Sequence, residues 1–240
     1  MIAVQRSPQP IILQKNEARW LNELRTAINE LQQVRNNPQA TKLIIDRAER
    51  KVKNAQNKYQ QKTIKDSLVK MFHNKCAYCE SKIGHVTYGE IEHFYPKGTY
   101  IDKTFDWDNL LLSCQICNNP RHKGTKFPLD RNGNPLLINP TDGVTAPPVH
   151  LKFDWNPKTQ LASIYGRDDR GREVVNIFDF NGLNGRKELI EYRSQYVKKL
   201  FFFLQSAQNG DAEAKALLQE ACLPKSEYSA FALALISIPI

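Results

Sequence analysis

Four cysteines form two closely spaced pairs in the middle of this 240-residue chain. Two residues separate Cys76 from Cys79 and Cys114 from Cys117, and 34 residues lie between the pairs. Such a spacing lets both thiolates of a pair reach one ion from a tight turn, and Zn²⁺ prefers four soft ligands in a tetrahedron. We therefore predict a structural zinc site, which is closed to substrate because protein ligands take all four positions.

Disulfides or redox pairs are the alternative to a metal, and the cellular compartment decides between them. Residues 1–10 are polar and lack the apolar core of a secretion signal. The apolar run at residues 229–240 is shorter than the roughly 20 residues that cross a bilayer, so we interpret it as a packing or partner-docking element. We expect a cytoplasmic protein with no membrane segment, in which thiols stay reduced and bind metal.

The chain between and after the cysteine pairs holds side chains suited to hydrolysis. Between the pairs lie EIEHFYPK (residues 90–97) and WDNLLL (residues 107–112), and NNPRHKG (residues 118–124) follows the last cysteine. Phosphodiester hydrolysis needs a deprotonated water and a cation beside the leaving oxygen. A neutral imidazole can take the proton of the water at cellular pH. Carboxylate and amide oxygens suit Mg²⁺ or Mn²⁺.

This order of motifs resembles that of the HNH, or ββα-metal, endonucleases, and it looks most like the HNH proteins of Septu-type and retron-linked phage-defence systems. The match spans about residues 76–129, and a weaker similarity continues through residues 138–140 and 150–151. The resemblance implies an α+β fold: a ββα-metal HNH core with a four-cysteine zinc site, an N-terminal helical hairpin and a mostly helical C-terminal extension. It also implies hydrolysis of DNA or RNA that leaves 5′-phosphate and 3′-hydroxyl ends.

The resemblance also implies roles for individual residues. His93 is the general base, and Asn109 holds the loop that carries it. Glu92 and Asn118 coordinate the catalytic Mg²⁺ or Mn²⁺, although most relatives carry Asp or His where this chain has Glu92. Three basic residues contact phosphates: Lys97, Arg121 and Lys123.

His122 is a further candidate ligand of the catalytic metal. Residues i and i+4 share one face of a helix, so Asn118 and His122 chelate one ion if this segment is helical. Pro120 permits that only if the helix starts close to Asn118, because proline is tolerated in the first turn. Glu92 and His93 carry a condition too: neighbours in a strand point to opposite faces, so both serve one site only if the backbone turns there.

Three segments must position these residues: a basic helical hairpin at 1–75, the nuclease core with its zinc-binding cysteine pairs at 76–130, and a C-terminal extension at 131–240. Apolar residues recur at helical spacing on both sides of a break near residues 36–38, which predicts two helices between about 16 and 72. In the third segment we expect strands at 149–155, 161–165 and about 174–178, the last after a turn at 168–171. Helices should follow at about 186–205 and 211–221.

The net charge of +9 points to an anionic partner, most simply nucleic acid. Between Lys42 and Lys75, ten Lys or Arg stand against three Asp or Glu. A solvated helix face is the usual explanation of such a run. Because this run directly precedes the proposed active site, we interpret it as a face that follows the phosphate backbone. The residues expected to contact nucleic acid there are Arg47, Arg50 and Lys51.

Partners and rival functions follow from the same motifs. By resemblance, the partner is a Septu-type ATPase, and a retron reverse transcriptase with its RNA–DNA product can join it. The main rival is a non-catalytic zinc-bound adaptor that binds nucleic acid or the ATPase: it gives His93 no role and makes Asn109 the cap of a helix through residues 110–112. A sequence-reading transcription factor is disfavoured, because no helix-turn-helix pattern is present.

Overall fold

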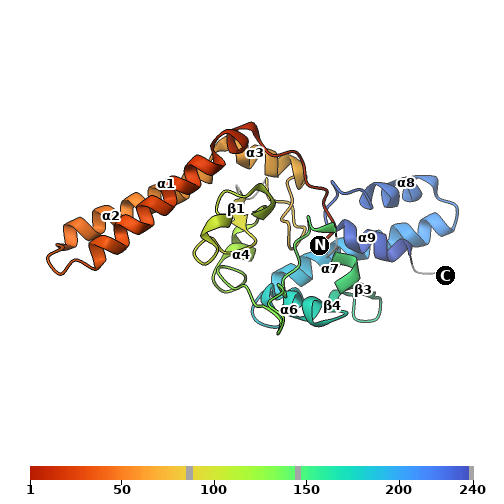
Figure 1. Cartoon of the computed structure of the whole chain (residues 1–240). Coiled ribbons are helices and arrows are strands. Elements are labelled where there is room, and N and C mark those ends of the chain that lie inside the picture. Colours follow the sequence, from red (N-terminus) through yellow and green to blue (C-terminus); the bar gives the residue numbers. More distant parts are fainter. Residues whose placement is uncertain (85–88, 144–146, 238–240) are drawn as a thin grey trace. The chain divides into compact units, whose positions relative to one another are not determined.

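The computed structural model describes residues 1–84, 89–143 and 147–237, and it confirms a mixed α+β fold (Figure 1). Contacts between residues divide the chain into two units. Unit 1 comprises Met1–Arg6, Val69–Glu90 and Leu112–Ile240, and unit 2 comprises Ser7–Leu68 and Ile91–Leu111. The boundaries expected from the sequence after residues 75 and 130 stay a prediction.

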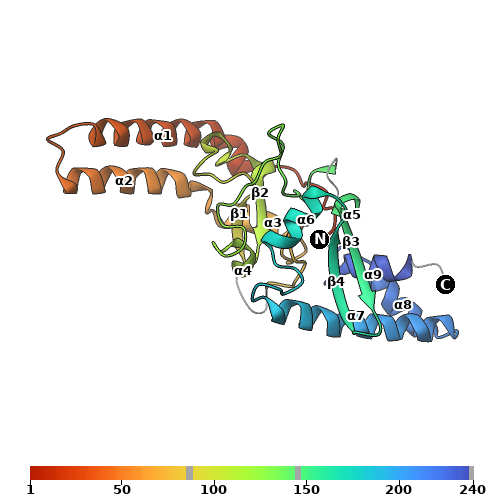
Figure 2. The same cartoon turned by 90° about the horizontal axis from the view of Figure 1, so that it is seen from below.

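Unit 2 contains the predicted N-terminal hairpin. The helices α1 (Ile11–Arg35) and α2 (Lys42–Gln56) lie side by side and run in opposite directions (Figure 2). The predicted break between them is confirmed. Beyond α2, a 3-10 turn, η1 (Asn57–Tyr59), interrupts the second predicted helix before it resumes as α3 (Lys62–Met71). The ion pairs Arg35–Glu49 and Lys51–Glu30 join the two helices of the hairpin, and Lys58 of η1 pairs with Glu23 of α1.

The middle of the chain has the expected order of strand, strand and helix. The strands β1 (Glu90–His93) and β2 (Leu110–Ser113) form a two-stranded sheet, and α4 (Gln115–Asn118) follows directly. Two further 3-10 turns lie between the strands, η2 (Ile101–Lys103) and η3 (Trp107–Asn109). The helix considered for residues 110–112 is wrong, because these leucines form β2 and all three are buried. A short run that is covered on both faces is typical of a strand.

The C-terminal half of unit 1 is a strand hairpin covered by helices. The strands β3 (Leu151–Asn156) and β4 (Leu161–Gly166) pair antiparallel, with Leu151 opposite Gly166 and Asn156 opposite Leu161. A short helix, α5 (Pro147–His150), precedes them. The helices α7 (Lys187–Gln208) and α8 (Ala212–Ala221) follow, so these two predicted strands and two predicted helices are confirmed. β4 contacts α7, and β3 contacts the last helix, α9 (Ser229–Ile236).

The strand predicted near residues 174–178 is wrong. This stretch belongs to a helix, α6 (Asp169–Ile177). The side chain of Asp168 caps its first turn by accepting a hydrogen bond of 2.9 Å from the backbone N–H of Gly171. Val174 and Ile177 are buried at a helical spacing of three residues. The N-cap and this spacing outweigh the strand preference of a short β-branched run.

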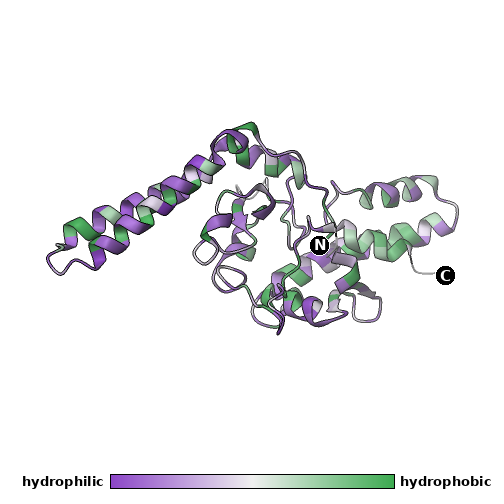
Figure 3. Cartoon of the chain, viewed as in Figure 1, coloured by the Kyte–Doolittle hydropathy of each residue, from purple (hydrophilic) through white to green (hydrophobic). Residues whose placement is uncertain are grey.

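Colouring by hydropathy shows α9 as an almost uniformly apolar helix (Figure 3). Phe231, Ala232 and Leu235 of this helix are buried, which agrees with the packing element expected from the sequence. The final residues of that expected element, 238–240, lie outside the described residues. Among the described helices, none is both long enough and apolar enough to span a membrane.

The start of α6 generates a test of the packing. A Cβ atom added to Gly171 would lie 2.0 Å from the carbonyl oxygen of His150. We expect Gly171→Ala to lower the free energy of unfolding by about 1–3 kcal/mol, the usual effect of overpacking, as measured by chemical denaturation. Gly98→Ala is the control, since a Cβ there meets nothing within 4 Å. Equal stability of the two variants would contradict this packing.

Candidate functional site

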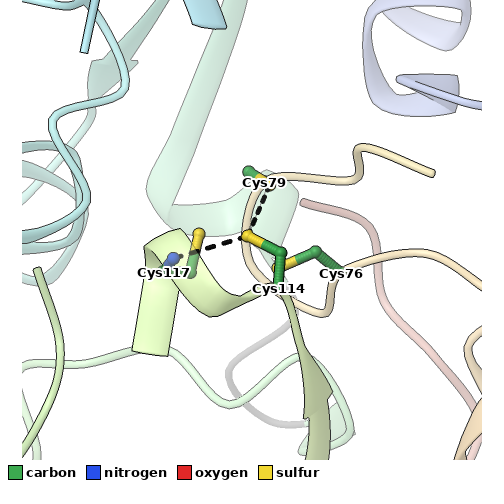
Figure 4. Close-up of side chains that lie close together, drawn as sticks. All are labelled: Cys76, Cys79, Cys114 and Cys117. Atoms are coloured by element: carbon green, nitrogen blue, oxygen red, sulfur yellow. Dashed lines mark hydrogen bonds between the residues drawn. The ribbon is translucent and has the colours of Figure 1, made fainter. Parts of the chain in front are cut away.

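The sulfur atoms of four cysteines converge at one point in unit 1 (Figure 4). Cys76 and Cys79 lie in the turn after α3, Cys114 caps α4, and Cys117 lies within α4. Their Sγ atoms all lie within 4.8 Å of one another. Zn–S bonds of about 2.3 Å in a tetrahedron place sulfurs about 3.8 Å apart, so this cluster fits one Zn²⁺ ion with small adjustments.

The cluster is electrostatically unusual for thiols. Hydrogen bonds from Cys114 and Cys117 hold the pKa of the Cys79 thiol well below its usual value, whereas burial raises the pKa of Cys117. The guanidinium of Arg186 donates a hydrogen bond of 3.3 Å to Sγ of Cys117. Burial lowers the pKa of Arg186, but the charges on Cys117 and Cys79 raise it more, so the net pKa lies above the usual value. A guanidinium therefore lies beside the sulfur of Cys117.

His93 lies at the end of β1 in unit 2, and its side chain is buried. Its Nε2 lies 2.9 Å from the carbonyl oxygen of Thr104. A carbonyl can only accept, so Nε2 carries a hydrogen, and in the neutral form of the ring the lone pair is on Nδ1. The ring of Tyr59 packs edge-to-face against the imidazole, with centroids 4.6 Å apart. These contacts fix both the tautomer and the orientation of His93.

Asn109, at the end of η3 in unit 2, is a buried hydrogen-bonding hub. Its Oδ1 accepts from the backbone N–H of Tyr95 at 2.6 Å, and its Nδ2 donates to the carbonyls of Tyr95 and Lys103 at 3.0 and 2.8 Å. Its own carbonyl accepts from the N–H of Phe94 at 2.9 Å. Asn109 thus binds the backbone directly after His93, as the predicted role of holding that loop requires.

The two expected oxygen ligands of the catalytic metal belong to different units. In unit 2, Glu92 is buried on β1. In unit 1, Asn118 is the last residue of α4, and its Nδ2 donates to Oε2 of Glu90 at 2.7 Å. Glu90 was missed from the sequence, although its spacing of two from Glu92 is the signal of a shared strand face. Its contact leaves the amide oxygen of Asn118 as the atom that can coordinate an ion.

The helical chelate predicted for Asn118 and His122 is wrong. α4 ends at Asn118, and Asn119 has extended backbone angles, as expected for a residue before Pro120. The two side chains are therefore not on one helix face. Nδ1 of His122 instead donates to the carbonyl of Ile177 at 3.2 Å. Burial, and then the charge of Arg186, lowers the pKa of His122, which favours a neutral ring.

The basic residues expected to contact phosphates differ in accessibility. Arg121, Arg47 and Arg50 are exposed. Lys97 is half-buried, and its Nζ donates to the hydroxyl of Tyr59 at 2.7 Å. Lys51 is exposed and pairs with Glu30. Lys123 has no exposed side-chain surface, so its ammonium group cannot meet a phosphate in this conformation.

A family model described as HNH endonuclease matches residues 76–124. Residues 76–124 are an HNH domain. The domain contains the cysteine cluster and the residues proposed for catalysis: Glu92, His93, Asn109 and Asn118. The sequence resemblance to the HNH family is thereby confirmed.

Two curated relatives extend the similarity beyond the HNH domain. The chain is 30% identical to the Septu protein PtuB of Bacillus mycoides (strain KBAB4) over 186 residues, 67% of this chain and 60% of the relative. It is 38% identical to the Septu protein PtuB of Bacillus thuringiensis over 123 residues, 50% of this chain and 42% of the relative. The chain thus spans about half the length of these relatives, and the similarity confirms the resemblance to Septu-type HNH proteins.

The cysteine cluster generates a prediction about zinc. Metal analysis of the purified chain should find about one zinc per chain, and Cys114→Ser should lose it and unfold at lower temperature, because structural zinc binding is itself folding free energy. Cys222→Ser is the control, since Cys222 follows α8 and lies outside the cluster. A Cys114→Ser chain that is as stable as the parent, with no metal in either, would contradict the zinc site.

Proposed function

We propose that the chain is a metal-dependent endonuclease that hydrolyses phosphodiester bonds of DNA or RNA, as the nuclease of an anti-phage defence system. The observation that carries the proposal is the hydrogen bond between Nε2 of His93 and the carbonyl of Thr104. Because Nε2 donates to this carbonyl, Nδ1 is the ring nitrogen to which we assign the role of general base, in the neutral form of the imidazole. A non-catalytic adaptor has no need of a buried histidine with a fixed tautomer.

In the proposed reaction, Nδ1 of His93 takes a proton from the water that attacks the phosphorus atom. Asn109 keeps the segment after His93 in place. Glu92 and Asn118 offer the hard oxygen donors that Mg²⁺ or Mn²⁺ prefers. When bound, such an ion supplies positive charge beside the leaving oxygen. Lys97 and Arg121 would hold the flanking phosphates.

The proposed biological setting rests on the two relatives. Their shared name, Septu protein PtuB, supports a role in a Septu-type system. The sequence resemblance implies an ATPase as the partner in that system. A retron reverse transcriptase and its RNA–DNA product are the additional partners that the sequence resemblance implies. We place this activity in the cytoplasm, where reduced thiols can bind zinc.

The catalytic role of His93 is tested by replacing it. His93→Ala should reduce cleavage of DNA and RNA pools in Mg²⁺ or Mn²⁺ by about 10²- to 10⁴-fold, the usual effect of losing a general base. Its zinc content and circular dichroism should match those of the parent. Glu92→Ala and Asn118→Ala should lose activity through the metal instead, so higher Mn²⁺ should partly rescue them and leave His93→Ala inactive.

His73→Asn provides the matched control. His73 is exposed and has a left-handed backbone angle of φ 52°, which asparagine tolerates better than alanine. This variant should cleave like the parent. Parental cleavage by His93→Ala would contradict the role of His93 as the general base. A folded, zinc-loaded parent that cleaves none of the pools would assign the chain to the adaptor class.

The basic face of α2 is tested by salt. If Arg47 and Arg50 contact phosphates, the double variant with glutamine at both positions should lower the slope of log K against log salt by about 2, because each lost contact on duplex DNA removes about 0.9. Glutamine at Lys187 and Lys199, two exposed positions of α7, is the charge-matched control. Equal slopes for the two double variants would assign the basic run of α2 to solubility or to a protein partner.

A further inference from the structure

A buried arginine reaches the cysteine cluster from outside the HNH domain. Arg186 directly precedes α7, and only 6% of its surface is exposed. Its Nη2 donates to Sγ of Cys117 at 3.3 Å, and its Nη1 donates to the carbonyl of Phe178 at 2.8 Å. The family match ends at residue 124. The contact with Cys117 therefore ties the predicted zinc site to the C-terminal half of unit 1.

The loop before Arg186 is folded around a buried carboxylate. Asp179 has a left-handed backbone angle of φ 45° and is 4% exposed. Its two carboxylate oxygens accept from the backbone N–H groups of Leu183, Asn184 and Arg186 at 2.8, 3.0 and 3.0 Å. Three backbone N–H groups of the loop, the last of them that of Arg186, thus bind the one carboxylate of Asp179. This loop presents the guanidinium in a single position.

A stacked pair of rings fixes the same loop to the first cysteine pair. Tyr78 lies between Cys76 and Cys79 in the sequence, and its ring stacks on Phe178 with centroids 4.3 Å apart. Phe178 is also the residue whose carbonyl accepts from Arg186. The loop therefore contacts both cysteine pairs, through Tyr78 and through Cys117. The geometry of the cysteine cluster therefore depends on contacts that an isolated HNH domain would lack.

The contact between Arg186 and Cys117 places a positive charge beside the predicted zinc site. A Zn²⁺ ion with four thiolates has a net charge of −2, and a buried charge is strongly unfavourable unless an opposite charge pairs with it. A guanidinium is always protonated and donates in a fixed direction, so it can pair with a buried anion without losing its own proton. Hydrogen bonds around a metal site orient its ligands and tune its affinity.

We propose that Arg186 is a positioning residue for the zinc, which offsets the charge of the metal–thiolate centre and fixes Cys117 as a ligand. The inference depends on the predicted zinc site and is independent of nuclease activity. It makes the retention of zinc a property of the C-terminal half as well as of the HNH domain.

Arg193 supplies the matched control within the same unit. It is also buried, at 1% exposed, but its guanidinium donates to the carbonyls of Ala162 and Phe180. Replacing either residue removes a buried guanidinium from the fold. Arg186 differs by its contact with a cysteine sulfur.

The test measures zinc release from the full-length, zinc-loaded chain. Arg186→Gln should release zinc to a chromophoric chelator about 10- to 100-fold faster than the parent, the usual effect of losing a partner of a metal ligand. Arg193→Gln should release it at nearly the parental rate, at a temperature where circular dichroism shows both variants folded. Arg186→Lys keeps the charge and should fall between Arg186→Gln and the parent.

Cobalt substitution provides a readout that general destabilisation does not move. A thiolate that loses an N–H donor becomes a better electron donor, so the thiolate-to-cobalt band of Arg186→Gln should shift to longer wavelength. The band of Arg193→Gln should stay in place. Equal zinc release from the two glutamine variants with unshifted bands would overturn the proposal, and so would a parent that binds no zinc.

Discussion

Sulfur atoms from two separate stretches of the chain meet within 4.8 Å, and much of the local architecture follows from that convergence. The 34 residues between the cysteine pairs must leave and return to the same point. Closing a loop of that length has an entropic cost that increases only slowly with length, so one metal site can offset it. The same closure helps a short insert keep a defined fold, whose described residues form two four-residue strands and two 3-10 turns.

Buried polar side chains then define the functional geometry at two places. Asn109 forms hydrogen bonds with the backbone after His93, and Asp179 forms hydrogen bonds with the backbone of the loop that ends at Arg186. Each would be unfavourable without its partners, because an unsatisfied buried polar group destabilises a fold by about 1–3 kcal/mol. Each therefore specifies one loop conformation. The backbone segments next to His93 and Arg186 owe their positions to these two residues.

The spacing of apolar residues in the sequence predicted those helices and strands that form mainly because of their own residues. The break after α1, the hairpin of β3 and β4, and the helices α7 and α8 were all expected from apolar spacing and turn residues. α6 was missed because a β-branched run hid an N-cap at Asp168, which takes effect only when its side chain meets Gly171. A local sequence pattern predicts helix or strand poorly when a single capping hydrogen bond determines which of the two forms.

The candidate site was predictable where its residues are adjacent in the sequence. Spacing alone indicated the four cysteines, and the family resemblance indicated His93 and Asn109. The pairing of Asn118 with Glu90 spans 28 positions, and that of Arg186 with Cys117 spans 69. No local spacing encodes such contacts. The helix on which a chelate by Asn118 and His122 depended is absent, because α4 stops at Asn118.

Tyr59 connects the N-terminal hairpin with the proposed base, His93. It belongs to η1, which directly follows the basic helix α2, and its ring packs on His93 while its hydroxyl accepts from Lys97. A ligand that shifts η1 by holding α2 would alter the packing of the imidazole. Coupling of this kind is reciprocal, so a substrate that fixes His93 would equally change the affinity of α2 for its ligand. A change at η1 would then reach the proposed base through one aromatic ring.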